Sequence, residues 1–176
     1  MRIVYFCMLL ITTLFACQDQ EISDIEISNS VELGKSEVYL NGERYENFTE
    51  FFHDTINDQL LFAFRKGDES LLNSLSFSFL PVSEGEYIVH NTFELYLGAQ
   101  SYFGQTVNSE FDGWVYKLIN AENGFFEISK LDQENMIIEG DFKVEFEVES
   151  KNGFGDTGLP DKVKFQGVFH ENYIKV

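Results

Sequence analysis

The sequence predicts an all-β protein, an antiparallel β-sandwich or barrel of about 8–10 strands. Three observations support this prediction. Apolar and polar residues alternate along most of the chain after Ser36, which is the period of a strand with one buried face. Turn-forming residues recur about every eight to fifteen residues, and no long amphipathic helix lies between them. Nineteen phenylalanines supply large side chains for the core of such a fold.

The clearest strand covers residues 135–150. Its apolar face consists of Ile138, Gly140, Phe142, Val144, Phe146 and Val148, and every residue between these positions is charged. We interpret the charged face as the solvated side of an antiparallel sheet, where like charges also discourage edge-to-edge aggregation.

The remaining elements are shorter. Asn41-Gly42, a strong hairpin signal, separates strands predicted at residues 37–40 and 43–46. Residues 47–57 are the one candidate for a helical turn. Further strands are predicted at residues 59–66, 72–80, 85–91, 93–97, 114–119, 124–131, 163–170 and 173–176.

The N-terminus has the features of a secretion signal. Arg2 precedes an uncharged stretch at residues 3–15, which is too short to span a bilayer. The stretch ends in Leu14-Phe15-Ala16-Cys17, which resembles the bacterial lipobox. This resemblance implies cleavage before Cys17 and acylation of that cysteine. The predicted organisation is therefore a signal peptide at residues 1–16, a lipidated cysteine with a flexible acidic tether at residues 17–35, and one all-β domain at residues 36–176.

Cleavage there would change the charge and the thiol content of the chain. It removes Arg2 and no acidic residue, so the formal net charge goes from −18 to −19. It also removes Cys7, so Cys17 is the only remaining cysteine and carries lipid. We therefore expect no disulfide and no cysteine chemistry. The acidity argues against a nucleic-acid partner, because phosphate binding needs a basic surface. We expect the lipid at the N-terminus to bind the protein to the membrane.

No catalytic spacing is found in the sequence, and we do not expect an enzyme or a cofactor. It contains no Gly-x-Ser-x-Gly motif, glycine-rich phosphate loop or Cys-x-x-Cys motif. His53, His90 and His170 lie far apart, so no metal site is predicted.

One segment is a candidate ligand-binding region. Residues 97–114 contain Tyr102, Phe103 and Trp114 among glycine and amide side chains. Exposed rings beside amides suit stacking on a sugar or contact with a protein. The alternative is that these rings pack into the core from a long connection.

The C-terminal half carries a longer pattern. A strand ending in Ile-x-x-Leu-Asp is followed by an Ile-x-Gly-x-Phe strand and, after a loop, by a Val-x-Phe-x-Gly-x-Phe strand. The matching residues are Ile128, Leu131, Asp132, Ile138, Gly140, Phe142, Val163, Phe165, Gly167 and Phe169. This pattern resembles a group of uncharacterised lipoproteins of Bacteroidota. Many of these place a tryptophan after the Asn-Gly turn, near Tyr45 here. We expect Gly140 and Gly167 to face inward and to admit an aromatic ring from the facing sheet.

These features together predict an outer-membrane lipoprotein that acts as a non-catalytic binding or accessory module for a glycan or a protein. Whether it lies on the cell surface or on the periplasmic leaflet is left open. Two alternatives are kept: a lipocalin-like carrier of a small apolar ligand, and a glycan hydrolase with a carboxylate pair.

Overall fold

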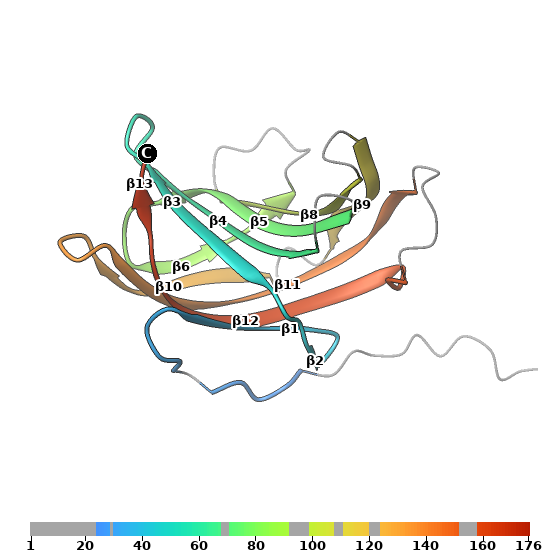
Figure 1. The fold of residues 1–176 in the computed structure, drawn as a ribbon, viewed down its shortest axis with the longest axis horizontal. Helices are drawn as coiled ribbons and strands as arrows, with labels where there is room; N and C mark the ends of the chain where they lie inside the picture. Colours follow the sequence, from blue (N-terminus) through green and yellow to red (C-terminus); the bar gives the residue numbers. More distant parts are fainter. Residues whose placement is uncertain are drawn as a thin grey trace, which may run out of the picture.

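The computed structural model describes residues 24–28, 30–67, 71–91, 99–107, 111–119, 124–151 and 158–176. Within these ranges every regular element is a β-strand, and the thirteen strands form one strongly curled open sheet, a half-barrel (Figure 1). The all-β prediction is confirmed. Three of the strands are only two residues long, which accounts for much of the difference from the expected 8–10. The predicted signal peptide, Cys17 and the strand at residues 93–97 lie outside the described residues.

The first seven strands in chain order are β1 (Lys35–Leu40), β2 (Glu43–Arg44), β3 (Phe48–Asp54), β4 (Gln59–Gly67), β5 (Leu71–Pro81), β6 (Gly85–Ile88) and β7 (His90–Asn91). They are followed by β8 (Gln100–Val107), β9 (Phe111–Ile119), β10 (Phe125–Asp132), β11 (Ile137–Lys151), β12 (Lys162–Asn172) and β13 (Ile174–Lys175). The main path through the sheet is β13-β3-β4-β5-β8-β9-β11-β12-β1-β2.

The long strand β11 connects the two halves of the sheet. It pairs with β12 along most of its length on one side. On the other side it pairs first with β10 and then, beyond Lys143, with β9. Strand β6 adds to the outer edge of β10.

The C-terminus connects the two ends of the curl. After β12 the chain crosses to the edge of β3, where β13 pairs with it in parallel. The backbone N–H of Val176 donates to the carbonyl of His53 at 2.9 Å, and the carbonyl of Val176 accepts from the N–H of Thr55 at 3.0 Å. This parallel pair and the one between β7 and β8 are short exceptions to the predicted antiparallel sheet.

The hairpin turns use side chains suited to their backbone. Asn41 and Gly42 have φ values of 52° and 84° and join β1 to β2, as predicted. The β3–β4 and β10–β11 turns are built alike. In each, an aspartate carboxylate, Asp54 or Asp132, accepts hydrogen bonds from backbone N–H groups and from the amide of an asparagine three residues later.

Phenylalanine rings fill the concave side of the sheet. Rings from six strands contact one another, among them Phe51, Phe62, Phe64, Phe77, Phe126, Phe142 and Phe169. At the β11–β12 pair, Phe169 lies opposite Gly140 and Phe142 lies opposite Gly167. Each ring lies over the glycine of the neighbouring strand. The prediction of inward glycines beside rings is therefore confirmed, but the rings come from the paired strand and not from a facing sheet.

Two segments differ from the sequence prediction. Residues 47–57 do not form a helical turn. They contain strand β3, in which Phe51 and His53 face inward, and the turn that follows it. Residues 97–114 are not one long connection, because residues 100–107 form β8. Strand β8 is not apparent from the sequence because its inward positions include the polar residues Ser101 and Gln105, each only 1% exposed.

We predict that Gly167→Ala lowers the free energy of unfolding by about 1–3 kcal/mol. A Cβ atom at this position would lie 2.7 Å from the ring of Phe142 and 3.0 Å from the carbonyl of Glu37, so the close ring contact would have to open. Urea unfolding of the purified protein measures the change.

Gly124→Ala is the matched control, because a Cβ atom there meets nothing closer than 3.5 Å. Equal effects of the two substitutions would contradict the role given to the Phe142–Gly167 contact.

Candidate functional site

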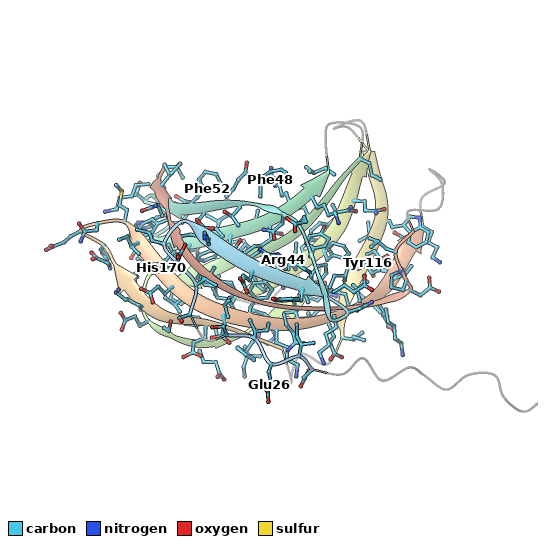
Figure 2. The ribbon with its side chains drawn as sticks, turned by 60° about the horizontal axis from the view of Figure 1, so that its bottom comes forward. Glu26, Arg44, Phe48, Phe52, Tyr116 and His170 are labelled. Atoms are coloured by element: carbon cyan, nitrogen blue, oxygen red, sulfur yellow. The ribbon has the colours of Figure 1, made fainter. Side chains whose placement is uncertain are left out.

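A strap from the N-terminal side crosses the outer face of the sheet. It consists of residues 24–28, 30 and 31, directly before β1. Alternate side chains face the sheet, so Ile25 and Ile27 are half-buried whereas Glu26 and Ser28 are exposed. Figure 2 shows the strap along the bottom of the domain, with Glu26 directed away from the sheet.

Polar contacts attach the strap at both of its ends. The Asp24 carboxylate forms ion pairs with Lys143 of β11, at 2.9 Å, and with Lys164 of β12. The N–H of Ile25 donates to Oε1 of Gln166 at 3.3 Å. At the other end, Nδ1 of His170 lies 3.1 Å from the carbonyl of Val31. Residues 24–28, 30 and 31, predicted as part of a flexible tether, are therefore held against the domain.

Between the strap and the sheet lies a cleft of about 470 Å³, which we call the strap cleft. Its volume falls in the range of small-ligand sites. Ile25, Ile27 and Val31 give it an apolar wall. Its floor is formed by the outward side chains of three strands, namely Phe125, Glu127 and Ser129 of β10, Glu139, Asp141 and Lys143 of β11, and Gln166, Val168 and His170 of β12.

Three carboxylates stand in one row across the sheet beside this floor. Glu86 of β6 is opposite Glu127 of β10, which is opposite Asp141 of β11. Like charges directly opposite one another on a sheet are destabilising. Within the described part of the chain, no basic side chain forms an ion pair with any of the three, although the nearby Lys143 pairs with Asp24 and Lys130 pairs with Glu139.

The neighbouring carboxylates and partial burial change the pKa of Asp141. Burial, with Glu127 and Glu86 nearby, raises the pKa of Asp141 to about 6. A hydrogen bond from protonated Asp141 to Glu127 also favours the neutral form. The cleft floor therefore holds a carboxyl pair in which Asp141 takes up a proton near pH 6, and at neutral pH this pair carries negative charge that no cation among the described residues neutralises by an ion pair.

This arrangement suits binding better than glycosidase chemistry. Carboxylates in glycosidases stand about 5–9.5 Å apart, flanking the scissile bond. Glu127 and Asp141 are directly opposite each other on paired strands, so their side chains lie side by side on one surface and do not flank a bond. Their unneutralised charge instead favours a ligand with a cationic or hydrogen-bond-donating group.

The three aromatic residues predicted as a ligand platform do not share one surface. Phe103 is fully buried and Trp114 is 9% exposed, and both belong to the core, where each contacts Tyr116. Lys151 Nζ covers the Trp114 ring at 4.2 Å from its centroid. Tyr102, half-buried, adjoins Phe103 in β8 and so points to the opposite face. The structure favours core packing for Phe103 and Trp114.

The histidines serve separate local contacts. Nε2 of His53 lies 3.0 Å from Asp58, and Nε2 of His170 lies 3.3 Å from Glu139. Among the described residues, no group of three or more His, Cys, Asp or Glu side chains is arranged to hold a metal ion. Nor does any described residue lie in a helix with the length and apolarity that a membrane crossing requires.

The strap cleft was missed by sequence reasoning. The charged ladder of β11 had been interpreted as fully solvated, and Asp24 lies 140 positions before Lys164 in the chain. The alternation of Ile25 and Ile27 with Asp24 and Glu26 was the one local signal that this segment lies against a surface.

No family model, curated protein or solved structure matches this chain. Its function therefore has to be inferred from the residues and their arrangement.

We predict that Asp141→Asn stabilises the protein at pH 7. The raised pKa means that the folded state holds the proton more tightly than the unfolded state, so the wild type loses stability as the pH rises from about 4 to about 7. The Asp141→Asn variant does not lose stability in this way, because its side chain does not ionise. The gain at pH 7 is about 1 kcal/mol, after allowance for solvent screening of a half-exposed group, and it disappears below about pH 4.

Urea unfolding at a series of pH values measures this difference. Glu149→Gln is the control, because it removes a carboxylate from an exposed position of the same strand. A gain that is the same at pH 4 and pH 7 would contradict the prediction.

Proposed function

We propose that the protein is a lipid-anchored, non-catalytic binding module of the bacterial outer membrane, and that the strap cleft receives a basic side chain of a protein partner. The observation that carries the proposal is the cleft itself, which joins an apolar wall to a negatively charged floor. The proposed anchor is the acylated Cys17.

The anchor is supported by the sequence. A basic residue, an uncharged stretch and Leu14-Phe15-Ala16-Cys17 follow one another at signal-peptide spacing. More than one acyl chain is needed for stable anchoring, and lipobox cysteines usually carry two or more. The chain that follows Cys17 leads directly to the strap.

The choice of partner is supported by charge. The row of Glu86, Glu127 and Asp141 has no cation of its own among the described residues, and the whole chain has a formal net charge of −18. Such a field attracts basic groups and repels anionic ones. Ile25, Ile27 and Val31 would pack against the aliphatic stem of a lysine or arginine.

The carboxyl pair is also the observation that favours the hydrolase alternative, since a raised pKa is typical of a general acid. Glu127 and Asp141 lie side by side on paired strands and do not flank a bond, which argues against a glycosidase. The carrier alternative has less support, because contacting phenylalanine rings pack the interior of the curl.

We predict that protein purified from membranes carries diacylglyceryl and acyl mass on Cys17. Cys17→Ala should move the protein from the membrane fraction to the soluble envelope fraction. Mass spectrometry of the N-terminal peptide measures the lipid. Protease treatment of intact cells, with a periplasmic protein as control, then distinguishes the cell surface from the periplasmic leaflet. An unmodified Cys17 would contradict the proposed anchor.

We predict that a tetralysine peptide shifts the amide NMR signals of Glu127, Asp141 and Gln166, because its ammonium groups would pair with the cleft carboxylates. Asp141→Asn should weaken this binding by about fivefold, the effect of one partly screened charge pair. Glu149→Gln, which removes a carboxylate remote from the cleft on the same strand, should not weaken it.

A neutral oligosaccharide is titrated in parallel. If the amide signals of the cleft shift with the oligosaccharide and not with the peptide, the partner is a glycan and not a protein. Cleavage of the oligosaccharide that is abolished by Asp141→Asn would favour the hydrolase. Peptide shifts spread over the whole acidic surface, and equal for both variants, would contradict the cleft as the binding site.

A further inference from the structure

The ion pairs of Asp24 each join an exposed carboxylate to a shielded lysine. The Lys164 side chain is only 6% exposed, and Lys143 is 25% exposed. Charges shielded from water and salt attract each other more strongly than exposed ones. Glu145 lies 3.5 Å from the same Lys164 ammonium group, and the Asn41 side chain accepts a hydrogen bond from the Lys164 backbone. Asp24 therefore docks on a rigid, buried cation.

The neighbouring strap residue adds packing to this contact. Ile25 Cγ2 would lie 3.5 Å from a Cβ atom on Gly42, so it rests against the β1–β2 turn. The first docked residues of the strap are thus at one corner of the domain, between β11, β12 and the β1–β2 turn.

Docking at Asp24 shortens the stretch of chain between Cys17 and the first residue attached to the domain. Seven residue steps separate Cys17 from Asp24, and they span at most about 24 Å when fully extended. Without the strap, the first attachment would be the hydrogen bond from the Gly34 N–H to the carbonyl of His170, seventeen steps from Cys17. That length spans at most about 58 Å.

We infer that the strap is a clamp that ends the membrane tether at Asp24, holds the β1–β2 corner of the domain next to the membrane, and presents the strap cleft to a partner held at that same membrane. This inference rests on the proposed lipidation of Cys17. The opposite end of the domain, with the β3–β4 turn and the C-terminus, is then the distal end (Figure 1). Lys164 and Val176 are twelve residue steps apart, so at most about 40 Å separates them.

The orientation is tested by energy transfer to the membrane. Mature lipidated protein is reconstituted in vesicles of phosphatidylethanolamine and phosphatidylglycerol that carry an acceptor dye on the headgroups. Donor dyes are attached through Glu43→Cys, beside the β1–β2 turn, or Asn57→Cys, in the β3–β4 turn, since Cys17 is blocked by lipid. Transfer from the first site is expected to exceed transfer from the second by about twofold or more.

The clamp is tested by Asp24→Asn, which removes both ion pairs of an exposed side chain and does not affect the core. The variant should bring the two transfer efficiencies close to each other. It should also accelerate hydrogen exchange of the Ile25 amide by about tenfold, because local opening no longer has to break the ion pairs. Glu26→Gln is the matched control, since it removes a charge from the same strap at a side chain that faces solvent.

The outcomes separate this inference from the proposed function. Equal transfer from both sites in the wild type, or an Ile25 amide that exchanges equally fast in all three proteins, would overturn the clamp even if Cys17 is lipidated. If protein purified from cells carries no lipid on Cys17 but its Ile25 amide is protected, the strap is docked and the proposed anchor is overturned.

Discussion

The tight curl of the sheet depends on two phenylalanine rings that lie over glycines. Phe142 and Phe169 face Gly167 and Gly140 across the β11–β12 pair, and a Cβ atom at either glycine would collide with a ring. Because these two rings cover the glycines of the paired strand, rings from β4 and β10 pack against them. Phe64 is 4.8 Å from Phe142, and Phe126 is 5.2 Å from Phe169. The aromatic core, and with it the half-barrel, is built outward from this pair.

The same two strands also form the candidate site, on their other face. Side chains alternate along β11, so Phe142 enters the core while its neighbours Asp141 and Lys143 reach the strap cleft. Lys143 forms an ion pair with Asp24 of the strap, whereas no basic side chain among the described residues forms an ion pair with Asp141. A change in how β11 packs against the core would therefore change both the clamp and the carboxyl pair.

Local sequence patterns predicted the elements but not the site. The alternation in β11, the Asn41-Gly42 turn and the inward glycines are local features, and the structure confirms each of them. Strand β8 was missed because Gln105 occupies a core position, where its amide donates to Asn73 at 2.6 Å. The strap cleft was missed because it joins Asp24 to a lysine near the other end of the chain. The alternation of Ile25 and Ile27 with charged residues indicates that this segment lies against a surface, but it does not identify that surface. Nor does the charged face of one strand reveal what covers it.

The pairing of β1 with β12 has a consequence for folding kinetics. Lys35 is opposite His170, so one of the first strands to be synthesised can pair only after one of the last has been made. Contacts so distant in sequence slow folding, because the loop between them must close before they contribute. For a chain that is threaded through a membrane as the proposed signal implies, this order is useful. With export as proposed, the sheet is completed only after its last strand has left the ribosome and the translocation channel.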